Sequence, residues 1–216
     1  MEGNEVVFLI FKFAVLIFSV IVHEVSHGLA ALRLGDDTAK RAGRITLNPL
    51  PHLELFGSFL LPMSLFLITN GAFVIGWAKP VPYDPARLRK PKIGSGIVAA
   101  VGPLSNILVA TIIAIILRFV VPLIDPTGAA PIGFLLSYIV YLNLILAVFN
   151  LVPLPPLDGS GILFSLLPER FYAVEQVLRQ YGFVILIMFI FFGFNFIIPV
   201  ADFLYSLLVG GLAVGV

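Results

Sequence analysis

Apolar residues in this chain gather into long stretches that are separated by short polar loops. A helix needs about 20 consecutive apolar residues to cross the hydrocarbon core of a bilayer. Four stretches reach this length: 6–34, 94–121, 132–152 and 183–209. We expect the last one to break at Pro199, because proline cannot continue a helix. The pattern predicts an all-α polytopic membrane protein, a helical bundle formed by residues 1–216 as a single transmembrane domain.

A fifth apolar stretch, 55–77, is interrupted by glycine, proline and asparagine, as in segments that enter the membrane without crossing it. The loops 33–52 and 79–92 on either side of it are both rich in Lys and Arg, which favours the cytoplasmic face for each. Both loops can lie there only if 55–77 dips into the membrane and returns. We therefore expect a re-entrant or β-like membrane loop between the first two core helices, with a full crossing as the alternative.

Composition supports a membrane protein and narrows the choice of partners. The 216 residues are 60% hydrophobic and 12% charged, and the mean hydropathy is +1.09, well outside the range of soluble domains. The net charge is +1 and the basic residues are spread over short loops, so nothing indicates nucleic-acid binding. Because the chain has no cysteine, any bound metal must be held by nitrogen and oxygen ligands.

Two of the three histidines flank a glutamate in the first apolar stretch, in the order His23-Glu24-Val-Ser-His27. Residues four apart share a helix face, so both imidazoles can reach one zinc ion while Glu24 flanks its open position. This spacing is the metalloprotease pattern. The alternative is a pair of buried histidines satisfied by neighbouring groups, but ionisable side chains at membrane depth are costly and mark functional sites.

A catalytic zinc takes three protein ligands, and Asp158 is the best source of the third. The prolines within 153–156 cannot continue the preceding helix, and they allow an extended stretch that redirects Asp158 toward the bundle. The alternative is an N-cap for a helix that begins around Gly161. If 55–77 is re-entrant, Asp158 reaches the membrane depth of the two histidines, which favours the ligand role.

Three ordered motifs now resemble the site-2 protease family of intramembrane zinc metalloproteases: HEVSH at 23–27, GPLSN at 102–106 and NLVPLPPLDG at 150–159. The stretches 35–49 and 76–82 further resemble the short prokaryotic branch of that family, which lacks a PDZ or CBS domain. The resemblance extends over about 23–167. The chain departs from that branch after His52. The branch often has one residue and then an acidic residue followed by proline, whereas this chain has Leu-Glu-Leu.

The resemblance implies a zinc metalloendopeptidase in which His23, His27 and Asp158 bind Zn²⁺ and Glu24 is the catalytic base. It implies an enzyme of regulated intramembrane proteolysis, which hydrolyses transmembrane segments of membrane proteins within the lipid bilayer, in a prokaryotic cell membrane. Asn150 is our candidate for a donor to the developing oxyanion, by its chemistry and its family position. A helix–helix hydrogen bond is the alternative for Asn150.

Packing between helices is the role that we expect for Asn143, Ser105 and Asn106. Residues 74–83 form a possible extended edge: Pro80 and Pro82 remove N–H groups on one side and leave the other side for pairing with an unwound substrate. A rigid interfacial turn, with Trp77 as a headgroup anchor, is equally compatible with this sequence. For His52 we expect an ordinary loop position at the membrane interface.

Two functions from other classes remain as alternatives. A metal-ion or proton transporter also places His and Asp side chains inside a helical bundle. Such a transporter would show an internal repeat and several distributed carboxylates, and the sequence has neither. A catalytically inactive relative that only binds membrane partners is disfavoured by the complete set of motif residues. The sequence does not indicate the substrate, the cleavage position or the oligomeric state.

Overall fold

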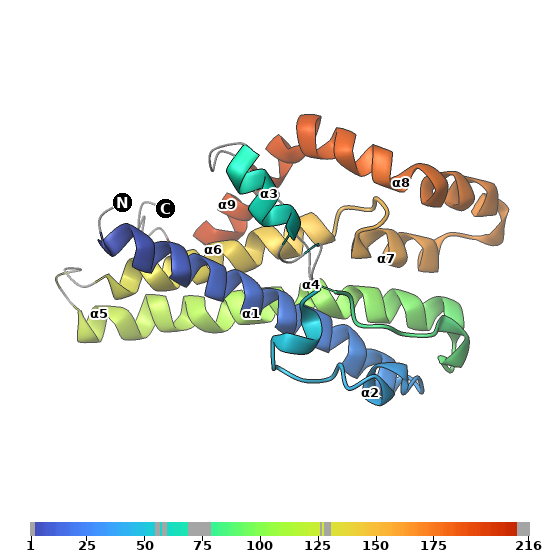
Figure 1. Ribbon diagram of the computed structural model, residues 1–216, viewed down its shortest axis with the longest axis horizontal. Helices are drawn as coiled ribbons and strands as arrows, with labels where there is room; N and C mark the ends of the chain where they lie inside the picture. The colour runs from blue at the N-terminus through green and yellow to red at the C-terminus, as the bar shows by residue number, and fades with distance from the viewer. Residues whose placement is uncertain are drawn as a thin grey trace. The chain divides into compact units, whose positions relative to one another are not determined.

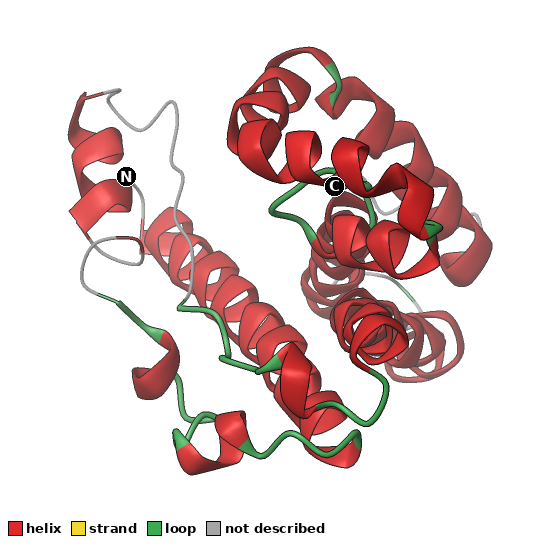
Figure 2. Cartoon of the chain, turned by 90° about the vertical axis from the view of Figure 1, so that its right-hand side faces the viewer, coloured by secondary structure: helices red, strands yellow, loops and turns green. Residues whose placement is uncertain are grey.

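The computed structural model describes residues 3–54, 57, 60–68, 79–125, 127 and 131–210 (Figure 1). The chain forms two compact units, Met1–Pro91 and Lys92–Val216, which are described separately below. The described residues form helices and loops, and no strand is found among them (Figure 2). Four helices in this part of the chain are long and apolar enough to span a membrane: Glu5–Arg33, Pro91–Ile124, Ile132–Asn150 and Glu169–Phe192. The expected all-α polytopic membrane fold is confirmed.

The first unit is built on one long helix, α1 (Gly3–Arg33), which carries the HEVSH motif in its second half. Its first half exposes large apolar side chains, as expected for a helix surrounded by lipid. After α1 the chain turns at Gly35, whose φ of +111° is a conformation that residues with a Cβ rarely adopt. The described part of this unit also contains α2 (Thr38–Arg41), α3 (Leu61–Ile68) and single 3₁₀ turns at Leu50–His52 and Pro85–Arg87.

The expected re-entrant loop at 55–77 lies largely outside the described residues. Its described part contains α3, an eight-residue helix that is apolar throughout except for one serine. Eight helical residues extend roughly 12 Å, which is too short to cross a bilayer core on their own. The re-entrant course of the whole segment stays a prediction.

The second unit is a set of helices joined by short connections. In chain order they are α4 (Pro91–Ile115), a π-helical turn (Ile116–Val120), α5 (Val121–Ile124), α6 (Ile132–Asn150), α7 (Asp158–Leu166), a 3₁₀ turn (Glu169–Phe171), α8 (Tyr172–Phe192), a 3₁₀ turn (Phe194–Phe196) and α9 (Ile197–Val209).

Small and branched apolar residues form the core of this second unit between α4, α6 and α9. Ala110, Ala114, Val140, Leu144 and Val209 are buried together there. Small side chains allow close approach of helix backbones, which drives association inside a membrane where the hydrophobic effect between helices is weak.

A buried polar contact also joins two helices of the second unit. The Nδ2 atom of Asn106 on α4 donates to Oδ1 of Asn143 on α6 at 2.9 Å, and both residues are fully buried. The Nδ2 atom of Asn143 donates in turn to the Ile139 carbonyl. Ser105 bonds within its own helix, to the Gly102 carbonyl. The expected packing role of Asn106 and Asn143 is confirmed.

The last apolar stretch breaks at a different place from the one expected. Helix α8 ends at Phe192, the Gly193 amide donates to the Phe189 carbonyl, and α9 begins at Ile197. Pro199 therefore lies in the first turn of α9. The first four N–H groups of a helix have no acceptor within it, so a proline there loses no hydrogen bond.

The proline-rich connection between α6 and α7 folds back closely on the end of α6. A Cβ at Gly159 would lie 2.3 Å from the Leu151 carbonyl oxygen and 2.4 Å from that of Val152. A Cβ at Gly182 of α8 would lie 2.5 Å from the Cβ of Pro155, so α8 packs directly on this connection. These contacts place Asp158 beside the carboxyl end of α6.

We expect Gly159→Ala to destabilise the protein by about 1–3 kcal/mol, because backbone carbonyls cannot move away as a flexible side chain would. Gly133→Ala is the matched control, since among the described residues the nearest atom to its Cβ is Cγ1 of Val121, 4.0 Å away. Thermal unfolding in detergent measures both. Equal midpoints for Gly159→Ala and wild type would contradict the close packing.

Candidate active site

The two motif histidines lie on one face of α1, with their imidazoles turned toward each other. Both are buried, the Nε2 atoms are 3.1 Å apart, and the ring planes meet at 84°. Two nitrogen ligands of one tetrahedral zinc, each at about 2.0–2.1 Å from the ion, lie roughly 3.3 Å from each other. The positions of His23 and His27 therefore fit two ligands of a single metal ion.

Glu24 is held by a backbone group from a distant loop. Its half-buried carboxylate accepts a hydrogen bond at Oε2 from the Val81 amide at 2.7 Å. Gly28, next to His27, makes the close approach possible, since a Cβ there would lie 3.0 Å from Cγ1 of Val81. The segment 79–82 therefore lies directly against the motif part of α1.

Both N–H groups within 79–82 are already engaged. Lys79 donates its amide to the His52 carbonyl at 2.8 Å, and Val81 donates to Glu24. Pro80 and Pro82 have no N–H to offer. A substrate strand pairing with these amides would have to replace both bonds, while residues 74–78 of the expected edge lie outside the described residues.

A buried arginine, Arg44, also binds the segment 79–82 through hydrogen bonds. The guanidinium of Arg44 donates from Nη1 to the Pro51 carbonyl, and from Nη2 to the carbonyls of Lys79 and Pro80 at 2.6 and 3.1 Å. In the sequence, Arg44 is one of several basic residues of the loop 33–52 and lies in the stretch that resembles the short prokaryotic branch. Nothing in the sequence of that loop distinguishes Arg44 from the neighbouring basic residues or indicates its bonds to the carbonyls of Lys79 and Pro80.

His52 is buried within its own loop, and the expected position of this loop at the membrane interface stays a prediction. Only 1% of its surface is exposed, and its Nε2 lies 2.9 Å from the Thr46 carbonyl oxygen. With the ring bonded inside the loop and its own carbonyl bonded to Lys79, His52 stabilises the loop that carries Arg44.

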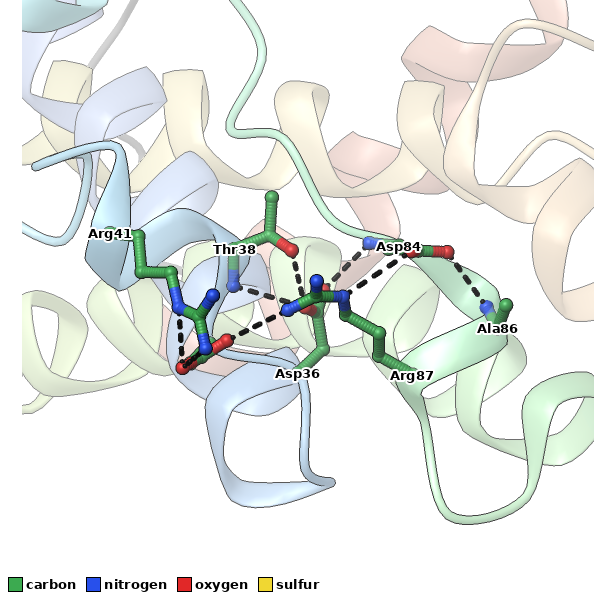
Figure 3. A network of polar contacts seen from close by, with 7 residues as sticks. Asp36, Thr38, Arg41, Asp84, Ala86 and Arg87 are labelled. Atoms are coloured by element: carbon green, nitrogen blue, oxygen red, sulfur yellow. Dashed lines mark hydrogen bonds and ion pairs between the residues drawn. The ribbon is translucent and has the colours of Figure 1, made fainter.

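A network of polar contacts around Asp36 joins the end of α1 to the loop that follows Val81 (Figure 3). Asp36 is fully buried, and its carboxylate accepts from the Thr38 amide and hydroxyl and, at 2.7 Å, from the Asp84 amide. Burial alone would raise the pKa of Asp36, but these hydrogen bonds together with the charge of Arg87 outweigh it and lower the pKa below the ordinary value of 3.8.

We expect Asp36→Asn to lower the free energy of unfolding at pH 7 by about 1.5–3 kcal/mol, the usual contribution of hydrogen bonds to a charged group. Because the folded pKa lies below the unfolded one, this stability is complete above about pH 4 and is lost as the pH falls through the folded pKa. Thermal unfolding from pH 7 to pH 3 should show the variant and wild type converging. Asp37→Asn, which removes an exposed ion-paired carboxylate, is the control. A constant difference at all pH values would contradict the assignment.

The remaining candidate residues, Asp158 and Asn150, lie in the second unit. Asp158 is the half-buried first residue of α7, and the N-cap position belongs to Leu157, which makes no side-chain cap bond. Asp158 is therefore not the N-cap, and α7 begins three residues earlier than the cap alternative assumed. Asn150 ends α6 and donates from Nδ2 to the Leu146 carbonyl at 2.9 Å, within its own helix.

Comparison with known proteins shows the family to which the chain belongs. The family model of Peptidase family M50 matches residues 123–191. The chain is 36% identical over 180 residues to YwhC of Bacillus subtilis, whose name proposes a zinc metalloprotease, and the match covers 80% of this chain and 76% of YwhC. The chain belongs to Peptidase family M50. This family membership confirms the resemblance to site-2 proteases that the motifs carry.

Other relatives of this M50 peptidase are mycobacterial. Rip2 of Mycolicibacterium smegmatis and Rip2 of Mycobacterium tuberculosis are each 30% identical to it, and the matches cover 63% and 62% of their lengths. Their names also propose zinc metalloproteases. No solved structure gives a significant match. The protein is a multi-pass membrane metalloprotease of a prokaryotic type that uses Zn²⁺, and a transporter is not favoured.

Proposed function

We propose that this M50 peptidase hydrolyses peptide bonds of transmembrane protein segments inside the bilayer, with His23, His27 and Asp158 as zinc ligands and Glu24 as general base. The observation that carries the proposal is the convergence of two buried imidazole Nε2 atoms at 3.1 Å on a membrane-spanning helix. A glutamate lies between the two histidines in the sequence, as the metalloprotease pattern requires.

The donor set fits a catalytic zinc. Two imidazole nitrogens and one carboxylate oxygen give three protein ligands and leave a fourth position open, as in other hydrolytic zinc sites. Asp158 suits the third place because it is a half-buried carboxylate at the start of α7 and takes no capping role there. The close packing of Gly159 against the Leu151 and Val152 carbonyls restrains the backbone next to Asp158.

The bound zinc would lower the pKa of a coordinated water toward about 7, which makes hydroxide available at neutral pH. Glu24 would take up the proton of the attacking water and later give it to the leaving amine. Oε2 of Glu24 already accepts from the Val81 amide, and we assign the proton to the other carboxylate oxygen, Oε1. The amide of Asn150 has two N–H donors, and the one that does not bond Leu146 can stabilise the developing oxyanion.

Membrane-protein substrates follow from the location of the motif. Glu24 and its flanking histidines lie in an apolar helix that is long enough to span a bilayer, so a soluble chain has poor access to them. A transmembrane substrate enters from the lipid instead. Its peptide bonds are hidden within its own helix, so the substrate must unwind locally before hydrolysis.

Metal removal tests this function. Purified protein in liposomes is incubated with a panel of membrane-protein reporters, each of which has one transmembrane segment embedded in the bilayer. The control substrate for each reporter is the same segment fused to a soluble protein and kept outside the bilayer. We expect cleavage of at least one membrane-embedded reporter, its loss after zinc removal by 1,10-phenanthroline, and its return with added zinc. Continued cleavage by the metal-free protein, or equal cleavage of the soluble fusion, would contradict the proposal.

A further inference from the structure

Arg44 is a buried charge that makes no ion pair with a carboxylate among the described residues. Only 6% of its surface is exposed, and the acceptors of its hydrogen bonds are the main-chain carbonyls of Pro51, Lys79 and Pro80. Burial of a guanidinium away from water costs several kcal/mol unless it is well compensated. A general preference for basic residues in this loop does not explain why the charge of Arg44 is buried.

One peptide group lies between Arg44 and Glu24. The Pro80 carbonyl accepts from Arg44 at 3.1 Å, and the N–H of the same peptide group, that of Val81, donates to Glu24 at 2.7 Å. In a trans peptide these two bonds point in opposite directions, so a cation and an anion are joined through a single amide. Hydrogen bonds in such a chain polarise and strengthen each other, more so where water is excluded.

The bonds on either side hold this peptide group in place. Arg44 also binds the carbonyl of Lys79, and the Lys79 amide donates to the His52 carbonyl. Val81 packs against Gly28 on α1. The peptide group therefore has little freedom to rotate, and the carboxylate that it binds is restrained in turn.

We propose that Arg44 is a positioning residue for Glu24 and acts through the Pro80–Val81 peptide group. It holds the Val81 N–H on Oε2, and this leaves Oε1 as the oxygen that exchanges a proton. The inference rests on the proposed role of Glu24 as general base. It assigns a function in catalysis to a residue outside the HEVSH motif and more than ten positions from it.

Three variants of loop arginines test the role of Arg44. Arg44→Gln removes the charge, and Arg44→Lys keeps the charge but loses the planar fork. Arg41→Gln is the matched control, because Arg41 is an exposed arginine of the same loop that pairs with Asp37 and does not bond to 79–81. Each protein is measured for kcat and KM on a cleaved reporter, for bound zinc and for thermal unfolding.

The second readout is the amide proton of Val81 in ¹⁵N-valine-labelled protein, identified by its absence in Val81→Ile. This signal does not depend on activity. A hydrogen bond to a carboxylate, strengthened from the other side by a guanidinium, moves it downfield. We expect an upfield shift in Arg44→Gln and in Glu24→Gln, an intermediate position in Arg44→Lys, and no change in Arg41→Gln.

For Arg44→Gln we expect a loss in kcat of about 10–100-fold, with KM and zinc content close to wild type and the protein still folded at the assay temperature. Partial recovery of kcat in Arg44→Lys supports the same role. The inference would be overturned by an unchanged kcat or by an unmoved Val81 signal in Arg44→Gln. It would also be overturned if the variant lost activity only in proportion to its loss of zinc or of folded protein. If Glu24→Gln cleaves normally, the proposed base role fails instead, and the Val81 signal still reports whether Arg44 and Glu24 are linked.

Discussion

Replacing Glu24 with glutamine is expected to lower the rate of reporter cleavage by about 10²–10⁴-fold, the usual contribution of a general acid–base group. Glutamine keeps the side-chain length and an oxygen that can accept the bond from Val81, but it cannot take up a proton at neutral pH. Zinc content should stay at the wild-type level, because Glu24 is not one of the proposed ligands. The measurement combines initial rates of cleavage with zinc determination on the same purified samples.

Glu5→Gln is the control for this prediction. Glu5 lies in the first turn of the same helix, so the change removes an equal charge from α1 without touching the motif. Its activity should match that of the wild type. Cleavage by Glu24→Gln at the wild-type rate would show that another group handles the proton.

The Asp158→Ala variant is expected to lose at least about a hundredfold in zinc affinity, since changes outside the ligand shell alone commonly cost 10–100-fold. Two histidines on one helix then provide the only proposed protein ligands. The loss should appear as substoichiometric zinc after purification and as rapid transfer of zinc to a fluorescent chelator. Cleavage should fall with it.

Asp125→Ala separates this effect from a general loss of acidic charge in the second unit. Asp125 follows the short helix α5 and belongs to none of the proposed sites. It should bind zinc as the wild type does. Stoichiometric, tightly held zinc in Asp158→Ala would remove Asp158 from the ligand set.

The helices and the first half of the site follow from local sequence patterns. Hydropathy alone places three spanning helices within a few residues of those observed, because lipid requires long apolar stretches with internal backbone hydrogen bonds. The fourth, expected at 183–209, is observed at Glu169–Phe192 instead. The convergence of His23 and His27 follows from helix geometry, in which residues four apart lie one above the other.

The contacts that surround Glu24 could not be predicted in this way. Val81 reaches Glu24 across 57 positions of sequence, and Arg44 reaches Pro80 across 36. Neither contact leaves a periodic pattern in the sequence, because the backbone carbonyl and amide groups that form it are common to almost every residue type. The expected break at Pro199 is wrong for a local reason, since proline in the first turn of a helix does not interrupt it.

The most direct test of the zinc site is the metal's own coordination shell in an Asp158→Cys variant. The chain has no cysteine of its own, so a zinc–sulfur distance of about 2.3 Å in X-ray absorption spectra can come only from the introduced thiolate. We expect this distance in Asp158→Cys, and only nitrogen and oxygen neighbours in the wild type and in Asp125→Cys. Zinc bound by Asp158→Cys without a sulfur neighbour would contradict the account.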